Sequence, residues 1–320
     1  MPVLDVNNLT TNYFTLRGPV RAAEGISFTL EKGETLGIAG ESGCGKTTIA
    51  LSLMRILPQG GRIIGGEVLL NGKNLLALNE SEMRQIRWKE MSIVFQGAMN
   101  ALNPVFKVGD QIVEAITTHE KINGSEAKDR ARKLLELVGV DPGRVDNYPH
   151  EFSGGMRQRA LIAMSLACNP QLVIADEPGT ALDVIVQAQV LRLMKDLKEK
   201  LNLSMILISH DLSIIAETSD KVAIMYAGKI VEYGDAVDIY REPMHPYTQG
   251  LIGAFPSISG ERKKLTSIPG QPPDLLHPPP ACRFNPRCPY VMEVCREVEP
   301  PLTEERKNHW VACHLYPAKA

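Results

Sequence analysis

The sequence lacks a charge excess, a long apolar run and a signal-peptide pattern. Its 35 Lys and Arg residues and 37 Asp and Glu residues leave a formal net charge of −2, whereas proteins that bind nucleic acid usually carry a basic excess. No apolar run approaches the roughly 20 residues that a membrane-spanning helix needs, and the N-terminus carries no secretion signal. We therefore expect no nucleic-acid partner, and a cytoplasmic protein that acts at a membrane only through a partner.

Cysteine is scarce and unevenly placed, and it forms no tight pair. Of the six cysteines among 320 residues, Cys44 and Cys168 are expected to be packing residues. The other four lie near the end of the chain: Cys282, Cys288, Cys295 and Cys313. They are separated by 5, 6 and 17 residues, so they lack the C-x₂₋₄-C pair of structural zinc sites and match no standard ferredoxin spacing. A cytoplasmic cluster favours metal binding over disulfides, but the spacing alone leaves free thiols, zinc and iron–sulfur open.

Residues 40–48, Gly-Glu-Ser-Gly-Cys-Gly-Lys-Thr-Thr, fit the phosphate-binding pattern G-x-x-x-x-G-K-[ST]. The glycines permit backbone angles that turn successive N–H groups toward an anion. Lys46 supplies a positive charge for the β- and γ-phosphates, and the hydroxyl of Thr47 is a hard oxygen ligand for Mg²⁺. An apolar strand over residues 34–39 precedes the loop, and a helix over residues 48–54 follows it with its N-terminal dipole toward the phosphates. The sequence therefore predicts binding of a nucleoside triphosphate.

Two alternating segments upstream, residues 3–6 and 25–30, predict strands. This prediction places Tyr13 in the loop between them. An aromatic ring there can stack on adenine, or it can be a half-buried aromatic of a strand, and Tyr13 alone does not decide between the two.

Two later strands end on polar side chains. The segment over residues 91–96 is a β-branched strand that ends on Gln96, and residues 172–177 are an apolar strand that ends on Asp176 and Glu177. Successive strand side chains point in opposite directions, so the two carboxylates can hold different roles. Asp176 suits the outer coordination sphere of Mg²⁺, and Glu177 suits polarising a water in line with the γ-phosphate. The alternative, a pair of solvated turn residues, is unusual after a strand this apolar.

Helical periodicity dominates residues 100–164. Ser153 is predicted to cap a helix there, and Gly154 and Gly155 let backbone N–H groups come close to an anion. Taken alone, this pattern is an ordinary capped loop. Asp183 precedes a further predicted helix.

The last third of the chain changes in character. A strand over residues 204–209 delivers His210, although a histidine at such a place is more often structural than functional. After about residue 240 prolines become frequent and periodicity is lost. This shift predicts a domain over residues 1–240 and a small appended module over residues 241–320 that does not extend the main sheet.

Taken together, these motifs occur in the order and spacing of the ATP-binding subunits of ABC transporters, which the chain resembles over roughly residues 1–240. The resemblance implies an α/β fold: a P-loop NTPase of ABC type, with a mixed β core, an antiparallel β subdomain and a helical subdomain over about residues 100–164. It also implies that the nucleotide is ATP and that the chain is an ATPase.

By the same resemblance, the nucleotide site draws on several motifs. Tyr13 stacks on adenine, and Gln96 contacts both Mg²⁺ and the attacking water. Glu177 is the general base, and His210 senses the γ-phosphate. The phosphates and Mg²⁺ are held by Ser42, Gly43, Cys44, Gly45, Lys46, Thr47 and Thr48, with Asp176 beside them.

The Ser153–Met156 signature is implied to serve the γ-phosphate bound to the opposite subunit of a head-to-tail dimer, with Asp183 at the seam. Hydrolysis needs anion-stabilising N–H groups on both sides of the γ-phosphate in a water-poor gap, and one subunit offers half of them. ATP would therefore hold two subunits together and hydrolysis would release them. Such a two-state closure can drive a membrane partner.

The chain also resembles a narrower branch, the oligopeptide, dipeptide and nickel importer ATPases. Met156 stands where most ABC proteins have Gln, and the tail carries His245-Pro-Tyr247, Ile268-Pro-Gly270 and Cys282-Arg-Phe-Asn-Pro-Arg-Cys288-Pro. This resemblance implies that the chain powers the import of dipeptides and oligopeptides. It also implies that the chain is a peripheral subunit on the cytoplasmic side of the cell membrane. The implied partners are two permease subunits, a second ATPase subunit (self or a paralogue) and an extracytoplasmic solute-binding protein. The alternatives are an importer ATPase for nickel or another solute, and an ABC ATPase that acts on ribosomes or DNA.

In similar proteins the four tail cysteines hold a [4Fe–4S] cluster, so the resemblance implies one here, with zinc as the alternative. We expect a structural role, because a small proline-rich module needs a cross-link to stay folded. A redox or metal sensor that gates transport is the alternative role. The chain departs from the family at Gly97, where an acidic residue is common, and at Gly179, where Thr is common; we expect both departures to leave catalysis intact.

Overall fold

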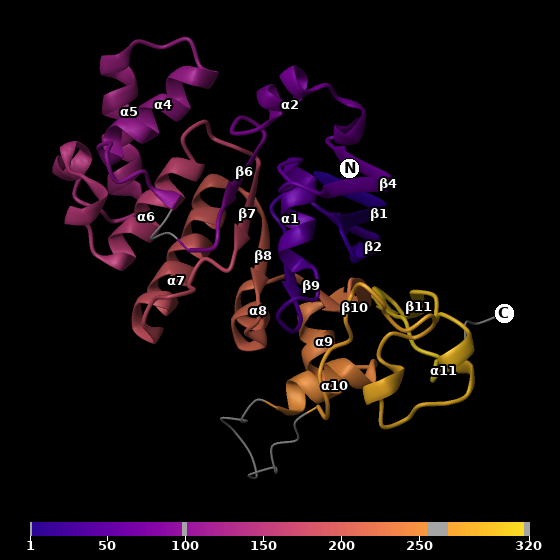
Figure 1. Ribbon diagram of the computed structural model, residues 1–320. Helices are drawn as coiled ribbons and strands as arrows, with labels where there is room; N and C mark the ends of the chain where they lie inside the picture. The colour runs from indigo at the N-terminus through magenta and orange to yellow at the C-terminus, as the bar shows by residue number, and fades with distance from the viewer. Residues whose placement is uncertain (1, 98–100, 255–267, 317–320) are drawn as a thin grey trace. The chain divides into compact units, whose positions relative to one another are not determined.

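Figure 1 shows the computed structural model of the chain, which describes residues 2–97, 101–254 and 268–316. The internal contacts divide the chain into two compact units. The first unit comprises residues 1–3, 30–34 and 70–207. The second unit comprises residues 4–29, 35–69 and 208–320. No described helix combines the length and the apolar character needed to cross a membrane.

The first unit joins a parallel sheet to a group of helices (Figure 1). Its strands are ordered β8-β7-β6, and β6 pairs with β7 in parallel with Val94 opposite Ala175. Helix α4 packs on α5, and both contact α6. The strands are β5 (Lys73–Asn74), β6 (Met91–Val94), β7 (Leu172–Asp176) and β8 (Ser204–Ser209), whose last residues belong to the second unit. The helices are η1 (Leu75–Ala77), α2 (Glu80–Ile86), α4 (Val108–His119), α5 (Gly124–Leu137), η2 (Pro142–Asp146), η3 (Pro149–Glu151), α6 (Gly154–Ser165) and α7 (Val184–Leu201).

Local sequence explains these elements. Every residue of β7 is buried, as expected of a continuous apolar strand in a parallel sheet that is covered on both faces. The hydroxyl of Ser153 accepts a hydrogen bond from the N–H of Met156 (3.3 Å), so it caps α6 as predicted. Helix α7 ends at Asn202, whose left-handed φ of 52° terminates the helix.

The second unit contains a mixed sheet in the order β11-β12-β10-β9-β3 and a separate antiparallel group in the order β2-β1-β4. Strand β3 pairs with β9 in parallel, and β9 pairs with β10 antiparallel across the turn at Ala227 and Gly228. The strands are β1 (Leu4–Thr15), β2 (Gly18–Leu30), β3 (Thr35–Ala39), β4 (Gly61–Leu70), β9 (Lys221–Tyr226), β10 (Lys229–Asp235), β11 (Thr303–Arg306) and β12 (His309–Val311). The helices are α1 (Lys46–Met54), α8 (Leu212–Thr218), α9 (Ala236–Arg241), α10 (Pro246–Gly253), η4 (Asn285–Arg287) and α11 (Val294–Glu297).

The predicted loop around Tyr13 is wrong. Strands β1 and β2 run much further than the short alternating segments suggested, and Tyr13 lies within β1. The chain reverses over two residues only, Leu16 and Arg17, and the hydroxyl of Thr15 donates to the carbonyl of Gly18 (2.9 Å) across this turn. Runs of polar residues in β1, and small residues and glycines in β2, interrupt the apolar alternation, so hydrophobicity alone did not show the full length of these strands.

The prediction that the tail does not extend the main sheet is also wrong. Strand β12 pairs with β10, with Trp310 opposite Tyr233, and β11 continues the sheet beyond β12. These strands have three and four residues, too short to give a periodic signal among the prolines. Main-chain hydrogen bonds between β10 and β12 therefore join the C-terminal segment, the described part of residues 241–320, to the rest of the second unit.

Candidate functional site

The loop over residues 40–48 connects β3 to α1 inside the second unit. Gly45 has a φ of 106°, and a Cβ atom there would lie 1.9 Å from the carbonyl oxygen of Ala22. A Cβ on Gly40, whose φ is 152°, would lie 2.2 Å from the carbonyl oxygen of Met225. Strands β2 and β9 thus approach the loop so closely that no side chain fits at either position. This accounts for the two glycines and leaves the backbone in the conformation that suits an anion nest.

Lys46 holds the centre of this loop. Its side chain is 5% exposed, and its ammonium donates to the carbonyl oxygens of Gly40 (2.7 Å) and Glu41 (3.0 Å). Ser42, Gly43 and Thr47 are exposed. The loop therefore carries a fixed cation with an exposed hydroxyl beside it, the two groups that a triphosphate and its metal ion require.

Cys44 and Tyr13 flank the loop. The pKa of the Cys44 thiol is raised by burial, as expected for a packing residue. The hydroxyl of Thr48, in the first turn of α1, lies 3.5 Å from the hydroxyl of Tyr13. Tyr13 is half-buried, so β1 presents it near the start of the helix that follows the loop, and its stacking on adenine stays a prediction.

Gln96 and Glu177 meet in the first unit. They follow the neighbouring parallel strands β6 and β7, whose carboxyl ends meet at the same edge of the sheet. The amide nitrogen of Gln96 donates to Oε2 of Glu177 (2.8 Å), and the hydroxyl of Thr180 donates to the same oxygen (2.9 Å). These bonds orient the carboxylate. Sequence reasoning found Gln96 and Glu177 but missed Thr180, for which the only available signal was a hydroxyl three residues further along.

Glu177 has a left-handed backbone with a φ of 46°. For a residue other than glycine this conformation costs on the order of 1–3 kcal/mol. Residues with such a strained backbone are concentrated at functional sites. Its neighbour Asp176 ends β7 and is 2% exposed. The two adjacent acids therefore occupy different environments, one buried and one half-buried.

The signature residues lie where two helices begin. Gly155, near the start of α6, faces α7 so closely that a Cβ atom would lie 2.6 Å from Cγ1 of Val186. Asp183 caps α7 by accepting a hydrogen bond from the N–H of Val186 (3.0 Å). Ser153 and Asp183 are both exposed. Two helix N-termini, each favourable to an anion, thus lie side by side at the surface of this unit.

The remaining predicted residues divide between the units. His210 follows β8 directly and is exposed in the second unit, together with Tyr13 and the phosphate loop. Gln96, the signature, Asp176, Glu177 and Asp183 belong to the first unit. Within the first unit the structure brings Gln96 to Glu177, and within the second unit it brings Tyr13 to Thr48 and Lys46 to the loop carbonyls.

The four tail cysteines are neighbours in the C-terminal segment. The N–H of Cys282 donates to the carbonyl of Cys295 (3.1 Å). The pKa values of Cys282 and Cys313 are each raised to about 11, first by burial and then by the charges of neighbouring cysteines. Within residues 2–97, 101–254 and 268–316, however, no three His, Cys, Asp or Glu side chains are arranged as ligands of a metal ion. The thiols are therefore gathered but not positioned around a metal.

Comparisons with known proteins extend the motifs to the whole chain. Residues 23–180 match the family model described as ABC transporter, and residues 231–295 match the one described as oligopeptide/dipeptide transporter, C-terminal region. The dipeptide transport ATP-binding protein DppD of Bacillus subtilis is 48% identical over 321 residues, which cover 99% of this chain and 96% of that protein. The oligopeptide transport ATP-binding protein OppD of Escherichia coli is 45% identical over 313 residues, covering 97% and 92%.

Solved structures share the fold. The ATP-binding cassette MJ0796, in a dimeric post-hydrolysis state bound to ADP and Pi, aligns with a TM-score of 0.66 at 23% identity, covering 73% of this chain and 98% of that one. The protein cbiO1 from Clostridium perfringens, part of the ABC transporter complex cbiONQ, aligns with a TM-score of 0.64 at 26% identity, covering 75% and 91%. The fold is thus that of an ABC-type P-loop NTPase. With relatives this similar over nearly its full length, the chain belongs to the ABC transporter family, among the ATP-binding proteins of its oligopeptide and dipeptide branch.

Proposed function

We propose that this chain hydrolyses ATP to power the import of dipeptides and oligopeptides through a membrane transporter. The observation that carries the proposal is the succession of two family matches, the ABC transporter region and then the C-terminal region of oligopeptide/dipeptide transporters. Relatives named for dipeptide and oligopeptide transport align with both regions. The second match favours a transport ATPase over an ABC ATPase that acts on ribosomes or DNA.

The proposal gives the chain partners at the membrane. It works with two permease subunits and a second ATPase subunit, either a copy of itself or a paralogue. An extracytoplasmic solute-binding protein delivers the peptide. The chain itself lies on the cytoplasmic side of the cell membrane as a peripheral subunit.

In this proposal the phosphate loop binds the triphosphate. The ammonium of Lys46 and the N–H groups of the loop neutralise the phosphate oxygens, and the ring of Tyr13 stacks on adenine. Mg²⁺, which the ATPase family implies, supplies charge neutralisation at the phosphoryl group that is transferred. The donors that fit it are the exposed hydroxyl of Thr47 and the exposed side chain of Gln96, both of which offer the hard oxygens that Mg²⁺ prefers.

Glu177 acts in the proposal as the general base. It accepts a proton from the attacking water, while Gln96 and Thr180 hold one of its oxygens and so fix the direction of the carboxylate. The left-handed backbone at Glu177 supports a functional role over a purely structural one. Asp176 would support the residues that hold the metal ion, and His210 would contact the γ-phosphate.

The signature acts in trans. Ser153, Gly154 and Gly155 would contact the γ-phosphate bound by a facing subunit in a head-to-tail dimer, and Asp183 would lie at the seam. The exposure of Ser153 and Asp183, and the closeness of their two helix N-termini, support this assignment. ATP binding then closes the dimer and hydrolysis opens it, which is the motion that drives the permeases.

We further propose a nucleotide-binding domain over residues 1–240 and a C-terminal extension over residues 241–320. The extension carries the cysteine group, for which the resemblance implies a [4Fe–4S] cluster, or zinc in its place. The gathering of the four thiols supports a shared ligand, but their present arrangement does not fit a metal ion. We therefore assign the cluster no step in hydrolysis.

The function is tested by reconstituting the chain with its permeases in lipid vesicles that hold the solute-binding protein. We expect dipeptides to raise ATP hydrolysis and to be taken up in proportion to it, with a nickel chelate as the control solute. Stimulation by the nickel chelate alone would move the cargo to nickel. Hydrolysis that responds to neither solute, in a chain that co-purifies with ribosomes or DNA, would overturn the transport proposal.

The cluster is tested on protein purified without oxygen. A visible absorption band, with iron and acid-labile sulfide in the ratio of a [4Fe–4S] centre, would support the cluster, and stoichiometric zinc without colour would support zinc. Colourless protein free of both metals, with four thiols that react with an alkylating reagent, would leave the cysteines as free thiols.

A further inference from the structure

Glu41, the second residue of the phosphate-binding loop, is held by residues from the C-terminal segment. The guanidinium of Arg287 makes a bidentate ion pair with its carboxylate, with distances of 2.6 Å and 3.0 Å. Arg287 is 5% exposed in its side chain and Glu41 is 27% exposed, so water screens the pair only partly. The hydroxyl of Tyr247 accepts a hydrogen bond from the backbone N–H of Glu41 (2.9 Å). Residues of the C-terminal segment thus hold both the carboxylate and the backbone N–H of Glu41.

The same residue also contacts Lys46, the phosphate-binding cation of the loop. The carbonyl of Glu41 accepts a hydrogen bond from the ammonium of Lys46 (3.0 Å), and it accepts another from the N–H of Cys44 (3.3 Å) that closes the first turn of the loop. A shift of Glu41 therefore moves one of the two carbonyl oxygens, those of Gly40 and Glu41, to which the ammonium of Lys46 donates. Glu41 thus connects the contacts of Arg287 and Tyr247 to the ammonium of Lys46.

Arg287 and Tyr247 are rigid anchors because they share a buried aromatic cluster. The rings of Tyr226 and Tyr247 lie 4.6 Å apart, and Phe284 packs against both at 5.1 Å and 5.5 Å. The guanidinium of Arg287 lies over the ring of Tyr226 at 5.7 Å, and its Nε donates to the carbonyl of Pro269 (2.8 Å). These contacts fix the side chains of Arg287 and Tyr247 independently of Glu41. Binding Glu41 therefore costs these two side chains little additional conformational entropy.

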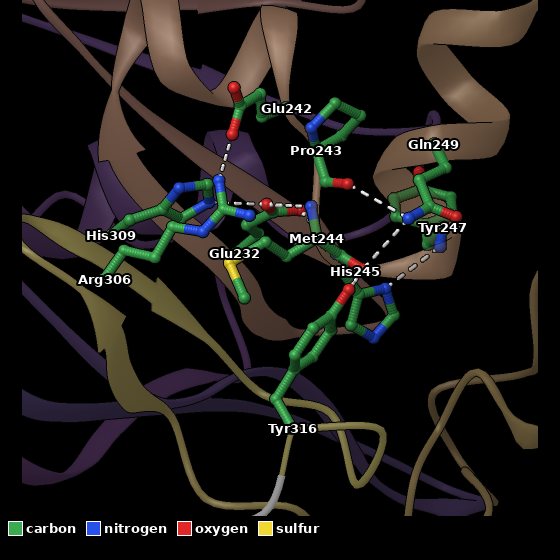
Figure 2. A network of polar contacts seen from close by, with 10 residues as sticks. All are labelled: Glu232, Glu242, Pro243, Met244, His245, Tyr247, Gln249, Arg306, His309 and Tyr316. Atoms are coloured by element: carbon green, nitrogen blue, oxygen red, sulfur yellow. Dashed lines mark hydrogen bonds and ion pairs between the residues drawn. The ribbon is translucent and has the colours of Figure 1, made fainter.

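A second network fixes the backbone behind Tyr247 (Figure 2). Glu232 is fully buried, and its carboxylate accepts hydrogen bonds from the N–H groups of Met244 (2.7 Å) and His245 (3.0 Å). His309, from β12, contacts the same carboxylate through Nε2 (2.7 Å). Nδ1 of His245 in turn accepts from the N–H of Tyr247 (3.0 Å). A buried network of satisfied hydrogen bonds is rigid, so Glu232 of β10 and His309 of β12 hold the backbone that leads to Tyr247 in place.

We propose that Arg287 and Tyr247 are positioning residues for ATP binding, which hold Glu41 and, through its carbonyl, the ammonium of Lys46. The C-terminal segment then sets the affinity of the phosphate loop for ATP. This inference rests on the proposed function of the loop and gives the tail a role in it. Neither residue touches the nucleotide; both act through Glu41.

The test measures equilibrium ATP binding, and KM and kcat for MgATP, on the full chain together with its thermal unfolding. In Arg287→Ala we expect the ATP dissociation constant and KM to rise roughly tenfold, the effect that one hydrogen bond to a charged group supports, with kcat within about twofold. Arg287→Lys keeps the charge but loses the planar guanidinium that makes the bidentate contact. Its affinity for ATP should lie between those of the unaltered chain and Arg287→Ala. Tyr247→Phe removes only the hydroxyl and should weaken binding by a smaller factor.

A matched control and a double variant separate positioning from stability. Arg306→Ala removes another ion pair of the same segment, with Glu242 on the surface (Figure 2), and should leave ATP affinity unchanged. Glu41→Gln should weaken binding about as much as Arg287→Ala, and the double variant should bind no more weakly than either, because the two side chains act through each other. Glu41→Gln also stands in for Arg287→Ala if the latter fails to fold.

Unchanged ATP affinity in both Arg287→Ala and Glu41→Gln, with a lowered unfolding temperature, would show that the ion pair only stabilises the fold. That result would overturn the positioning role but not the proposed function of the loop. Additive losses in the double variant would also overturn the positioning role. Failure of the unaltered chain to bind ATP would instead refute the proposed function of the loop.

Discussion

Replacing Glu177 by Gln removes the negative charge of the proposed general base with the smallest possible change in the shape of its side chain. Glutamine keeps the length of the side chain and an oxygen that can accept from Gln96 and Thr180, which now donate at 2.8 Å and 2.9 Å. It also has the same backbone preferences, so the left-handed φ of 46° persists at the same cost. What disappears is the charge that accepts a proton from water. We therefore expect a catalytic defect in a nearly unaltered fold.

The expected size follows from these contacts. Loss of a general base lowers kcat by about 10²–10⁴-fold, or about 2.7–5.5 kcal/mol in the activation free energy. Two hydrogen bonds to a charged oxygen become hydrogen bonds to a neutral one, and because one of them is exposed and the other part-buried, the free energy of unfolding should fall by about 1 kcal/mol at most. The unfolding temperature should fall by only a few degrees.

The assay is steady-state hydrolysis of MgATP, with ATP binding measured by equilibrium titration and stability by thermal unfolding. Glu199→Gln, the same exchange on an exposed residue of α7, is the control and should behave as the unaltered chain. Hydrolysis by Glu177→Gln within about twofold of the unaltered rate would remove Glu177 from the role of base. A large loss of ATP binding would also refute the reasoning, because the charge would then act in binding.

Two further predictions follow from buried geometry. Gly45→Ala should weaken ATP binding at least about tenfold in an equilibrium titration, because its Cβ would lie 1.9 Å from the carbonyl oxygen of Ala22 at a φ of 106°; normal affinity would show that the loop tolerates another shape. Burial lowers the pKa of His245 from 6.5 to about 4, so the unfolded chain binds this proton first and the free energy of unfolding should fall by up to about 3 kcal/mol between pH 6.5 and pH 4. His245→Asn, which keeps an acceptor for the N–H of Tyr247, should flatten this dependence in denaturant titrations, and an unchanged slope would assign it to other groups.

Much of the site could be predicted because it is encoded locally. The apolar run of β7 predicted where Asp176 and Glu177 would lie, and the side chain of Ser153 predicted the start of α6. The contact between Gln96 and Glu177 follows from two strands that end at one edge of a parallel sheet. In each case a short pattern determines the element, and the element places the side chain.

The parts that escaped prediction depend on partners distant in sequence. Tyr13 lies in a strand whose polar residues concealed its alternation. Strand β12 is three residues long and is defined by its pairing with β10. The ion pair of Glu41 with Arg287 joins residues 246 positions apart, and no local pattern in either segment announces the other. Long-range pairing of this kind becomes visible only in the folded chain.

The central claim is that the phosphate loop of one subunit and the signature of another complete one ATP site. It is tested most directly by mixing two variants that are each inactive: Glu177→Gln, which lacks the base, and Ser153→Glu, which places a repelling charge in the signature. In a mixed dimer, one site joins the intact loop and base of one subunit to the intact signature of the other. We predict that the mixture hydrolyses ATP although neither variant does so alone. Full hydrolysis by Ser153→Glu alone, or no recovery in mixtures shown to contain mixed dimers, would contradict the claim.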